Sequence, residues 1–215
     1  VMGDSFGLEN VLWFANNKED AHEDPTIKRS RSHDYVSKEV INVRENVGLI
    51  EVANFSKHEF KGPDARKFLD HIMAGRLPKP GRISLSPMLS YRGKLCGDLT
   101  VACLDENEFM VFGSGAAQEM HRRWFESHLD KFNLSYLNRS DEYHGLSIAG
   151  PNSRKVLEKI VRDDVSNEKF KFRDSRRMFV GGVPAIINRI SFTGELGYEI
   201  YVAPHYQLKL YEELM

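Results

Sequence analysis

The sequence predicts an α+β fold with mixed or mostly antiparallel sheets and flanking helices. Segments with strand character outnumber possible crossover helices, and several are separated only by hairpin-length turns. A strand, a Gly-Pro turn and a helix follow one another twice along the chain. No glycine fingerprint of a dinucleotide-binding or phosphate-binding loop is present. A parallel doubly wound sheet is therefore disfavoured.

Length and charge exclude several classes of protein. The 215 residues suffice for one large domain or two small ones with a real core. With 30 Lys+Arg against 31 Asp+Glu the formal charge is −1, so neither nucleic acid nor an anionic membrane is an expected partner. No apolar run approaches the roughly 20 residues of a membrane span, and no signal pattern opens the chain. We expect a protein that is neither membrane-spanning nor exported.

Cys96 and Cys103 stand seven residues apart in a strand-like run. A straight strand would separate them by roughly 20 Å, too far for a disulfide. Without a second pair they cannot form a structural zinc site. We expect two reduced thiols in a reducing compartment and predict no metal site.

The first half of the chain begins with an apolar stretch at 7–14 and a polar segment at 16–34, which we interpret as a surface loop or linker. A helix is expected over 35–46, because its apolar residues recur at helical spacing, with Gly48 as a left-handed C-terminal cap. Extended segments are expected at 49–53 and 57–61, the second as a half-buried strand with polar and apolar residues alternating. Residues 62–73 then predict a helix with Pro63 in its first turn.

The remaining elements follow from the same periodicities. A short polar turn at 105–107 joins two of the expected strands as a hairpin. Strands are expected at 82–89, 94–104, 108–112, 177–180, 184–191 and 197–202, and helices at 116–129 and from 205 onward.

The strand, Gly-Pro and helix unit at 57–73 recurs at 146–160. The Gly-Pro pair, an Arg-Lys pair, a leucine and an isoleucine return at matching offsets, 88 residues later. This repetition indicates two related α+β halves, although a common β-turn-α connection would give a similar pattern. The last helix shows no stop signal and the chain starts at Val1, so we expect a fragment of a larger protein.

Asp98 is the first candidate for chemistry. It stands at the head of the otherwise apolar part of the strand expected at 94–104, where a carboxylate is disfavoured by strand propensity and by the cost of burial. Alternation places Asp98 on one face with Thr100 and Ala102. An exposed aspartate at a strand end, beside a glycine, is an equally good interpretation of the pattern.

Glu199 is the second candidate, in a segment 192–200 that also carries Glu195 in a turn. Bulky strand-forming residues surround Glu199, and a carboxylate there could accept paired N–H donors from a flat heterocycle. A solvent-facing strand residue would look the same.

Other polar residues are weaker candidates. No two histidines stand at metal-ligand spacing with a third donor nearby, and exposed or half-buried structural roles are expected for His71, His121 and His128. The arginine pairs 122–123 and 176–177 more often solvate a face than bind phosphate. No nucleophile signature is present.

Three blocks of sequence, at 87–101, 148–157 and 191–199, resemble the folate-binding T-protein family of aminomethyltransferases. This family comprises the glycine-cleavage protein and the matching regions of dimethylglycine and sarcosine dehydrogenases. The resemblance covers nearly the whole chain, and Asp98 falls on the catalytic aspartate of the family. Glu199 falls on the glutamate that grips the pterin ring. Segment 7–14 is similar to the junction that follows the flavin domain in the dehydrogenases.

The resemblance implies two related ferredoxin-like halves of a T-protein-type fold, truncated before its C-terminal barrel. It implies a linker from a missing flavin domain at 1–34 and a C-terminally incomplete folate-binding aminomethyltransferase-type domain at 35–215. The implied activity is tetrahydrofolate-dependent transfer of a one-carbon unit from a methylated amine, with FAD confined to the missing N-terminal domain. The expected location is the bacterial cytoplasm or the mitochondrial matrix.

The chain departs from the family at two positions of the expected folate site. Leu85 stands thirteen residues before Asp98, where many members carry tyrosine, and Ser114 stands sixteen after it, where many carry asparagine. Leucine cannot donate a hydrogen bond, and serine reaches less far than asparagine. Both departures favour the alternative of a non-catalytic folate-fold module used in regulation or interaction. An S-demethylase of the same fold is a third possibility, in which Asp98 would have little to do.

Overall fold

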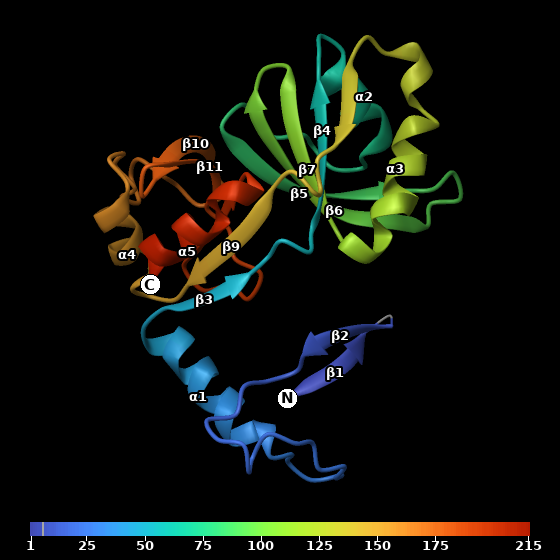
Figure 1. Cartoon of the computed structure of the whole chain (residues 1–215). Helices are drawn as coiled ribbons and strands as arrows, with labels where there is room; N and C mark the ends of the chain where they lie inside the picture. Colours follow the sequence, from blue (N-terminus) through green and yellow to red (C-terminus); the bar gives the residue numbers. More distant parts are fainter. Residues whose placement is uncertain (6) are drawn as a thin grey trace.

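The computed structural model describes residues 1–5 and 7–215, and its body consists of two five-stranded sheets with helices on their outer sides (Figure 1). A hairpin of β1 (Met2–Ser5) and β2 (Leu8–Val11) and the helix α1 (Ser32–Glu45) come first in the chain. Figure 1 shows these three elements below the two sheets, in blue. Within the described ranges, no helix combines the length and apolar character that a membrane crossing requires.

The first sheet has the strand order β5-β6-β7-β4-β8, and every neighbouring pair is antiparallel. Helices α2 (Ala65–Ile72) and α3 (Gln118–Glu126) pack on it. Its strands are β4 (Ser56–Lys61), β5 (Arg82–Leu89), β6 (Leu95–Asp105), β7 (Glu108–Gly113) and β8 (Ser135–Asn138).

The second sheet has the order β10-β11-β12-β9-β3 and is also antiparallel throughout. Helices α4 (Ser153–Ile160) and α5 (Gln207–Leu214) pack on it. Its strands are β3 (Gly48–Glu51), β9 (His144–Ala149), β10 (Ser175–Val180), β11 (Val183–Asn188) and β12 (Gly197–Val202).

The two sheets repeat one topology. Replacing β4, β5, β6 and β7 by β9, β10, β11 and β12 converts the first strand order into the second. The fifth position differs, because β8 fills it in the first sheet and β3, from the start of the chain, fills it in the second. β3 precedes the first repeat unit in the chain but completes the second sheet, so this strand ties the two halves together. β8 lies at the end of the first half and completes the first sheet. The repetition predicted from the Gly-Pro units is thus present in the fold.

Buried side chains form three clusters that define four layers. One cluster lies between α2, α3 and the first sheet, and another lies between α4, α5 and the second sheet. The third joins the two sheets directly and contains Ile83, Ala102, Met110 and Phe112 from the first sheet with Ile186 and Tyr201 from the second. The order is therefore helices, sheet, sheet, helices, as expected for amphipathic layers that bury both sheet faces.

The α+β class, the antiparallel pairing and the expected elements are confirmed, with bounds within a few residues. Three local predictions are wrong. Gly48 does not cap α1 but opens β3, and its φ lies outside the left-handed region. Pro63 precedes the helix, which begins at Ala65. Strand β4 is buried on both faces at its start, where Lys57 was expected to be exposed, because the second sheet covers that face; the face opens to solvent only at Lys61.

Helix α1 forms where its periodicity predicts, but none of its residues is buried. Val36, Val40 and Ile41 are exposed in the described structure. The expected free thiols are found: Cys103 is buried in the core of the first half and Cys96 is half-buried.

Candidate functional site

The contact between the two sheets is the setting of the site. The rings of Phe112, on β7, and Tyr201, on β12, stack with their centroids 4.6 Å apart. Both side chains are almost fully buried, so this contact fixes how the two inner faces meet. Residues two positions away on the same strands share these inner faces.

Asp98 lies on the inner face of the first sheet. It pairs with Pro87 of β5, and alternation along β6 puts it on the face of Thr100 and of Ala102, which belongs to the inter-sheet cluster. The side chain is exposed, and none of the ion pairs found within residues 1–5 and 7–215 includes it. Asp98 is therefore an uncompensated carboxylate at the end of the inter-sheet contact.

Glu199 lies on the inner face of the second sheet, because Tyr201 is two residues further along β12. It is half-buried, and its Oε2 accepts a hydrogen bond of 2.9 Å from the Tyr201 hydroxyl. Burial raises the pKa of the Glu199 carboxyl above its usual value, and the hydrogen bond from Tyr201 opposes this shift. The pKa of Tyr201 is raised well above its ordinary value by burial beside this carboxylate.

Two strand neighbours of Glu199 are polar and buried. Asn188 of β11 and Ser147 of β9 flank Glu199 in the sheet. Asn188 Oδ1 accepts a hydrogen bond of 2.7 Å from Ser175, whereas its Nδ2 has no partner among the described residues. A buried amide donor without a partner is costly unless another group satisfies it. The region around Glu199 therefore holds one carboxylate oxygen and one amide N–H with hydrogen-bonding capacity to spare.

Asp98 and Glu199 lie toward the same end of the contact. Ile83 N donates to Arg173 O at 2.8 Å and Ser175 N donates to Gly81 O at 2.9 Å, so β5 and the start of β10 run antiparallel side by side.

This bridge fixes the relative direction of the two edge strands that meet there. In the first sheet, the step from Gly81 to Ile83 leads toward Pro87, the partner of Asp98. In the second sheet, the same direction runs along β10 from Arg177 to Ser175. Arg177 is aligned across the sheet with Tyr201, and Ser175 is aligned with Glu199. The two carboxylates are thus displaced in the same direction from the ring stack.

Leu85 and Ser114 share this region. Leu85 pairs with Thr100 on β6 and is 63% exposed although it is a large apolar side chain. Ser114 follows the last residue of β7 and is exposed. Because side chains alternate along an extended chain, Ser114 lies on the same inner face as Phe112, two residues earlier. The four residues that the sequence singled out therefore lie on the two inner faces.

Lys57 is a polar residue of the inner faces that sequence reasoning missed. It pairs with Phe112, is fully buried, and its Nζ lies 5.9 Å from the centroid of the Tyr201 ring. Burial lowers the pKa of Lys57 to about 8. Asn188 was also missed. Neither carried a signal, because a single polar residue in a strand is buried or exposed according to what packs on it.

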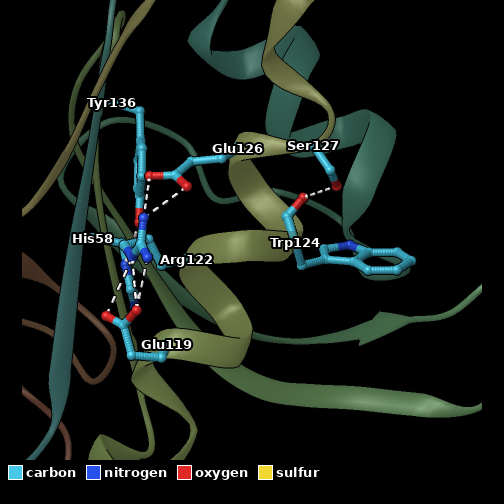
Figure 2. A network of polar contacts seen from close by, with 7 residues as sticks. All are labelled: His58, Glu119, Arg122, Trp124, Glu126, Ser127 and Tyr136. Carbon is cyan, nitrogen blue, oxygen red and sulfur yellow. Dashed lines mark hydrogen bonds and ion pairs between the residues drawn. The ribbon is translucent and has the colours of Figure 1, made fainter.

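The remaining candidates have structural surroundings. Arg122 of α3 pairs with Glu119 and Glu126, each at 2.8 Å, on the outside of the molecule (Figure 2). Arg177 pairs with Glu108 at 2.7 Å across the two sheets. The expectation for His121 is wrong, because it is buried rather than exposed or half-buried. The described residues contain no cluster of His, Cys, Asp and Glu suited to a metal ion.

A cavity of about 360 Å³ lies elsewhere, on the second half of the chain. It is bordered by the edge strand β10 and by Tyr143 and Tyr201. Asp98, Glu199, Leu85 and Ser114 do not line it. The candidate site is thus an open edge between the sheets and not this cavity.

Comparison with known proteins gives a consistent set of relatives. The chain matches the family described as GCVT N-terminal domain over residues 1–215. It is 34% identical over 217 residues to the mitochondrial dimethylglycine dehydrogenases of Mus musculus and Homo sapiens, covering 100% of this chain and 25% of theirs. It is 30% identical over 175 residues to an aminomethyltransferase of Halothermothrix orenii, covering 80% of this chain and 48% of that one.

Two solved structures share the fold. The glycine cleavage system aminomethyltransferase T of Bartonella henselae superposes with a TM-score of 0.73 at 23% identity, over 82% of this chain and 47% of that one. A heterotetrameric sarcosine oxidase of Corynebacterium superposes with a TM-score of 0.62 at 18% identity, over 88% of this chain and 93% of that one. The chain thus spans about a quarter of the length of the dehydrogenases that it resembles and about half of the aminomethyltransferases.

Proposed function

The chain belongs to the GCVT N-terminal domain family, and we propose that it is the folate-binding part of an enzyme that passes a one-carbon unit from a methylated amine to tetrahydrofolate. Its similarity to dimethylglycine dehydrogenases over its whole length favours a methylated glycine as the amine. In this proposal the amine is oxidised in an N-terminal domain that carries FAD, outside this chain. The protein would then act in the mitochondrial matrix or the bacterial cytoplasm.

One observation supports the proposal more than any other: Asp98 and Glu199 lie on facing inner faces, displaced toward the same end of the Phe112–Tyr201 contact. The two residues are about a hundred positions apart in the chain. Two carboxylates on facing sheets could serve the two ends of such a ligand, one binding the flat heterocycle and the other its reacting amine.

Glu199 would bind the pterin ring. One of its oxygens is engaged by Tyr201, and the other is open to an N–H donor. Because burial raises its pKa, the ionised form is under-solvated, and paired N–H donors would stabilise it. The unpartnered Nδ2 of Asn188, in the neighbouring strand, could donate to an acceptor on the same ring.

Asp98 would act on the proton of the reacting amine. Tetrahydrofolate, when bound, supplies the nucleophilic amine that accepts the one-carbon unit. An exposed carboxylate with no ion pair among the described residues can orient that amine and hold its proton. General-base and electrostatic assistance of this type contributes about 10²–10⁴-fold to a rate.

The test compares two reactions of the complete protein. In D98N, tetrahydrofolate-dependent formation of the one-carbon product should fall by about 10²–10⁴-fold, whereas reduction of the flavin by the amine should stay unchanged. An equal loss of both reactions would show that Asp98 is structural, and an unchanged transfer rate would end the proposed role of this residue.

A non-catalytic folate-fold module is the second candidate. Leu85 and Ser114 favour it, because leucine cannot donate the hydrogen bond of the tyrosine that many family members carry, and serine reaches less far than their asparagine. Titration of the complete protein with tetrahydrofolate separates the two. Saturable binding that weakens in E199Q supports the enzyme, and an absence of binding supports the module.

A further inference from the structure

His121 joins the backs of the two strand segments that carry Asp98 and Ser114. It belongs to α3, and only 2% of it is exposed. Its Nε2 lies 3.2 Å from the carbonyl oxygen of Cys96, and since a carbonyl only accepts, Nε2 carries the proton and donates. The helix thereby binds β6 two residues before Asp98.

Gly97 and Gly113 make room for the imidazole ring. A Cβ at Gly97 would lie 2.8 Å from His121 Nε2, and a Cβ at Gly113 would lie 3.0 Å from His121 Nδ1. Neither glycine has a φ in the left-handed region. The backbone conformation therefore does not require glycine at these positions, but packing does. The imidazole is the nearest group at Gly97, whereas at Gly113 the Leu99 side chain, 2.7 Å away, shares the space with the imidazole.

The two glycines immediately precede Asp98 and Ser114. Because side chains alternate along an extended chain, contact between His121 and the glycine positions on the helix side leaves Asp98 and Ser114 on the inner face. His121 thus touches the reverse side of both segments at once.

The two segments do not pair with each other, although β4 pairs with Gly113 and β5 pairs with Gly97. The pairing of β6 with β7 begins at Thr100 and Phe112. It therefore includes neither Asp98 nor Ser114. On the other side, Asp98 is paired with Pro87, which has no N–H to donate, and the register of β5 and β6 shifts between Met88 and Leu89. His121 thus bridges two segments that the β6–β7 pairing leaves unconnected.

We propose that His121 is a positioning residue that clamps the backbone at Gly97 and Gly113 and so orients Asp98 and Ser114 for the one-carbon transfer. The proposal rests on the function proposed for that edge. His121 itself stays on the far side of the sheet and touches no reacting atom. Burial lowers the pKa of His121, which keeps the ring neutral with one fixed tautomer.

His58 provides a matched control. It is also buried in the layer between α3 and the first sheet, with its ring centroid 6.3 Å from that of His121. Its Nδ1 bonds the Tyr136 hydroxyl of β8 at 2.9 Å, on the side of the sheet away from β6 (Figure 2). Replacing His58 removes a buried imidazole from the same layer without touching the segments of Asp98 and Ser114.

The experiment uses the complete protein with H121L, H121Q, H58L and G97A. Hydrogen exchange is measured at residues 96–98 and 113–115, and kcat and KM for tetrahydrofolate are measured beside flavin reduction. H121L and G97A should speed exchange in these segments at least tenfold and lower kcat for transfer at least tenfold, with flavin reduction unchanged. H121Q, whose side-chain amide can still donate to Cys96 O, should restore most of both.

H58L should lower the melting temperature without changing exchange at 96–98 or kcat for transfer. Equal effects of H58L and H121L, or unchanged exchange in H121L and G97A, would overturn the clamp. Failure of the proposed function is seen separately, because D98N would then leave transfer intact, whereas the exchange readout does not depend on any activity.

Discussion

The hydroxyl of Tyr201 donates a 2.9 Å hydrogen bond to the carboxylate of Glu199, two residues earlier on the same strand. The Tyr201 ring also stacks on Phe112 of the opposite sheet. One side chain therefore links the contact between the sheets to the carboxylate that is proposed to bind folate.

Replacing Glu199 by glutamine should separate stability from binding. The folded-state pKa of Glu199 is raised, so its ionisation becomes unfavourable to the folded state as pH rises above the usual 4.5 of a glutamate. In E199Q the free energy of unfolding at pH 7 should be equal or higher, and the Kd for tetrahydrofolate should rise at least tenfold. Thermal unfolding between pH 4 and 8 and ligand titration measure the two effects. Loss of stability at pH 7 with unchanged Kd would contradict both expectations, and E45Q, at an exposed position of α1, is the control.

Replacing the exposed Leu85 by tyrosine, together with S114N, should increase the affinity for tetrahydrofolate. Leu85 is 63% exposed, so a tyrosine there should fit without overpacking and change stability by no more than about 0.5 kcal/mol. L85Y combined with S114N should lower the Kd for tetrahydrofolate, because L85Y adds a hydroxyl donor near the proposed site and S114N replaces a hydroxyl by an amide of longer reach. Isothermal titration of the double variant and of each single variant tests this. An unchanged or weaker Kd would argue against folate at this edge.

Acid should destabilise the fold through His58. Burial lowers the pKa of His58 to about 4, whereas an unfolded histidine titrates near 6.5. The unfolded state therefore binds more protons between these values, and stability that is complete above pH 6.5 should be lost as pH falls toward 4, by roughly 3 kcal/mol. The free energy of unfolding, measured with urea at a series of pH values, should fall less steeply with decreasing pH in H58N than in the wild type. The same slope in both would assign the acid sensitivity to other groups, among them His121.

The ring stack between the sheets should carry a large share of the stability. Phe112 is 5% exposed and contacts Tyr201 across the two halves, so F112A should lower the free energy of unfolding by about 3–5 kcal/mol. Phe172 is 62% exposed, and F172A should change it by no more than about 0.5 kcal/mol. Urea denaturation measures both. Similar losses in the two variants would mean that the sheets do not meet through Phe112.

The features that could be predicted from the sequence alone are those that depend on short-range residue patterns. The two-residue period of strands and the 3.6-residue period of helices depend on neighbouring residues, so most elements, the repeated Gly-Pro units and the candidates Asp98 and Glu199 could be identified from the chain alone. Two of the failures were local, whereas those at β4 and His121 concerned burial. Gly48 and Pro63 stand beside helices but not at the capping positions that their residue types suggested.

Tertiary structure decided which distant segments meet. The pairing of β3 with β9 and the burial of Lys57 depend on packing between layers, which no short-range period encodes. The same holds for the two glycines beneath His121: each looks like an ordinary strand glycine until α3 crosses the sheet above them. The residue type determines the chemistry of a side chain. Its partners and its exposure to water are determined by chain segments that lie far away in the sequence.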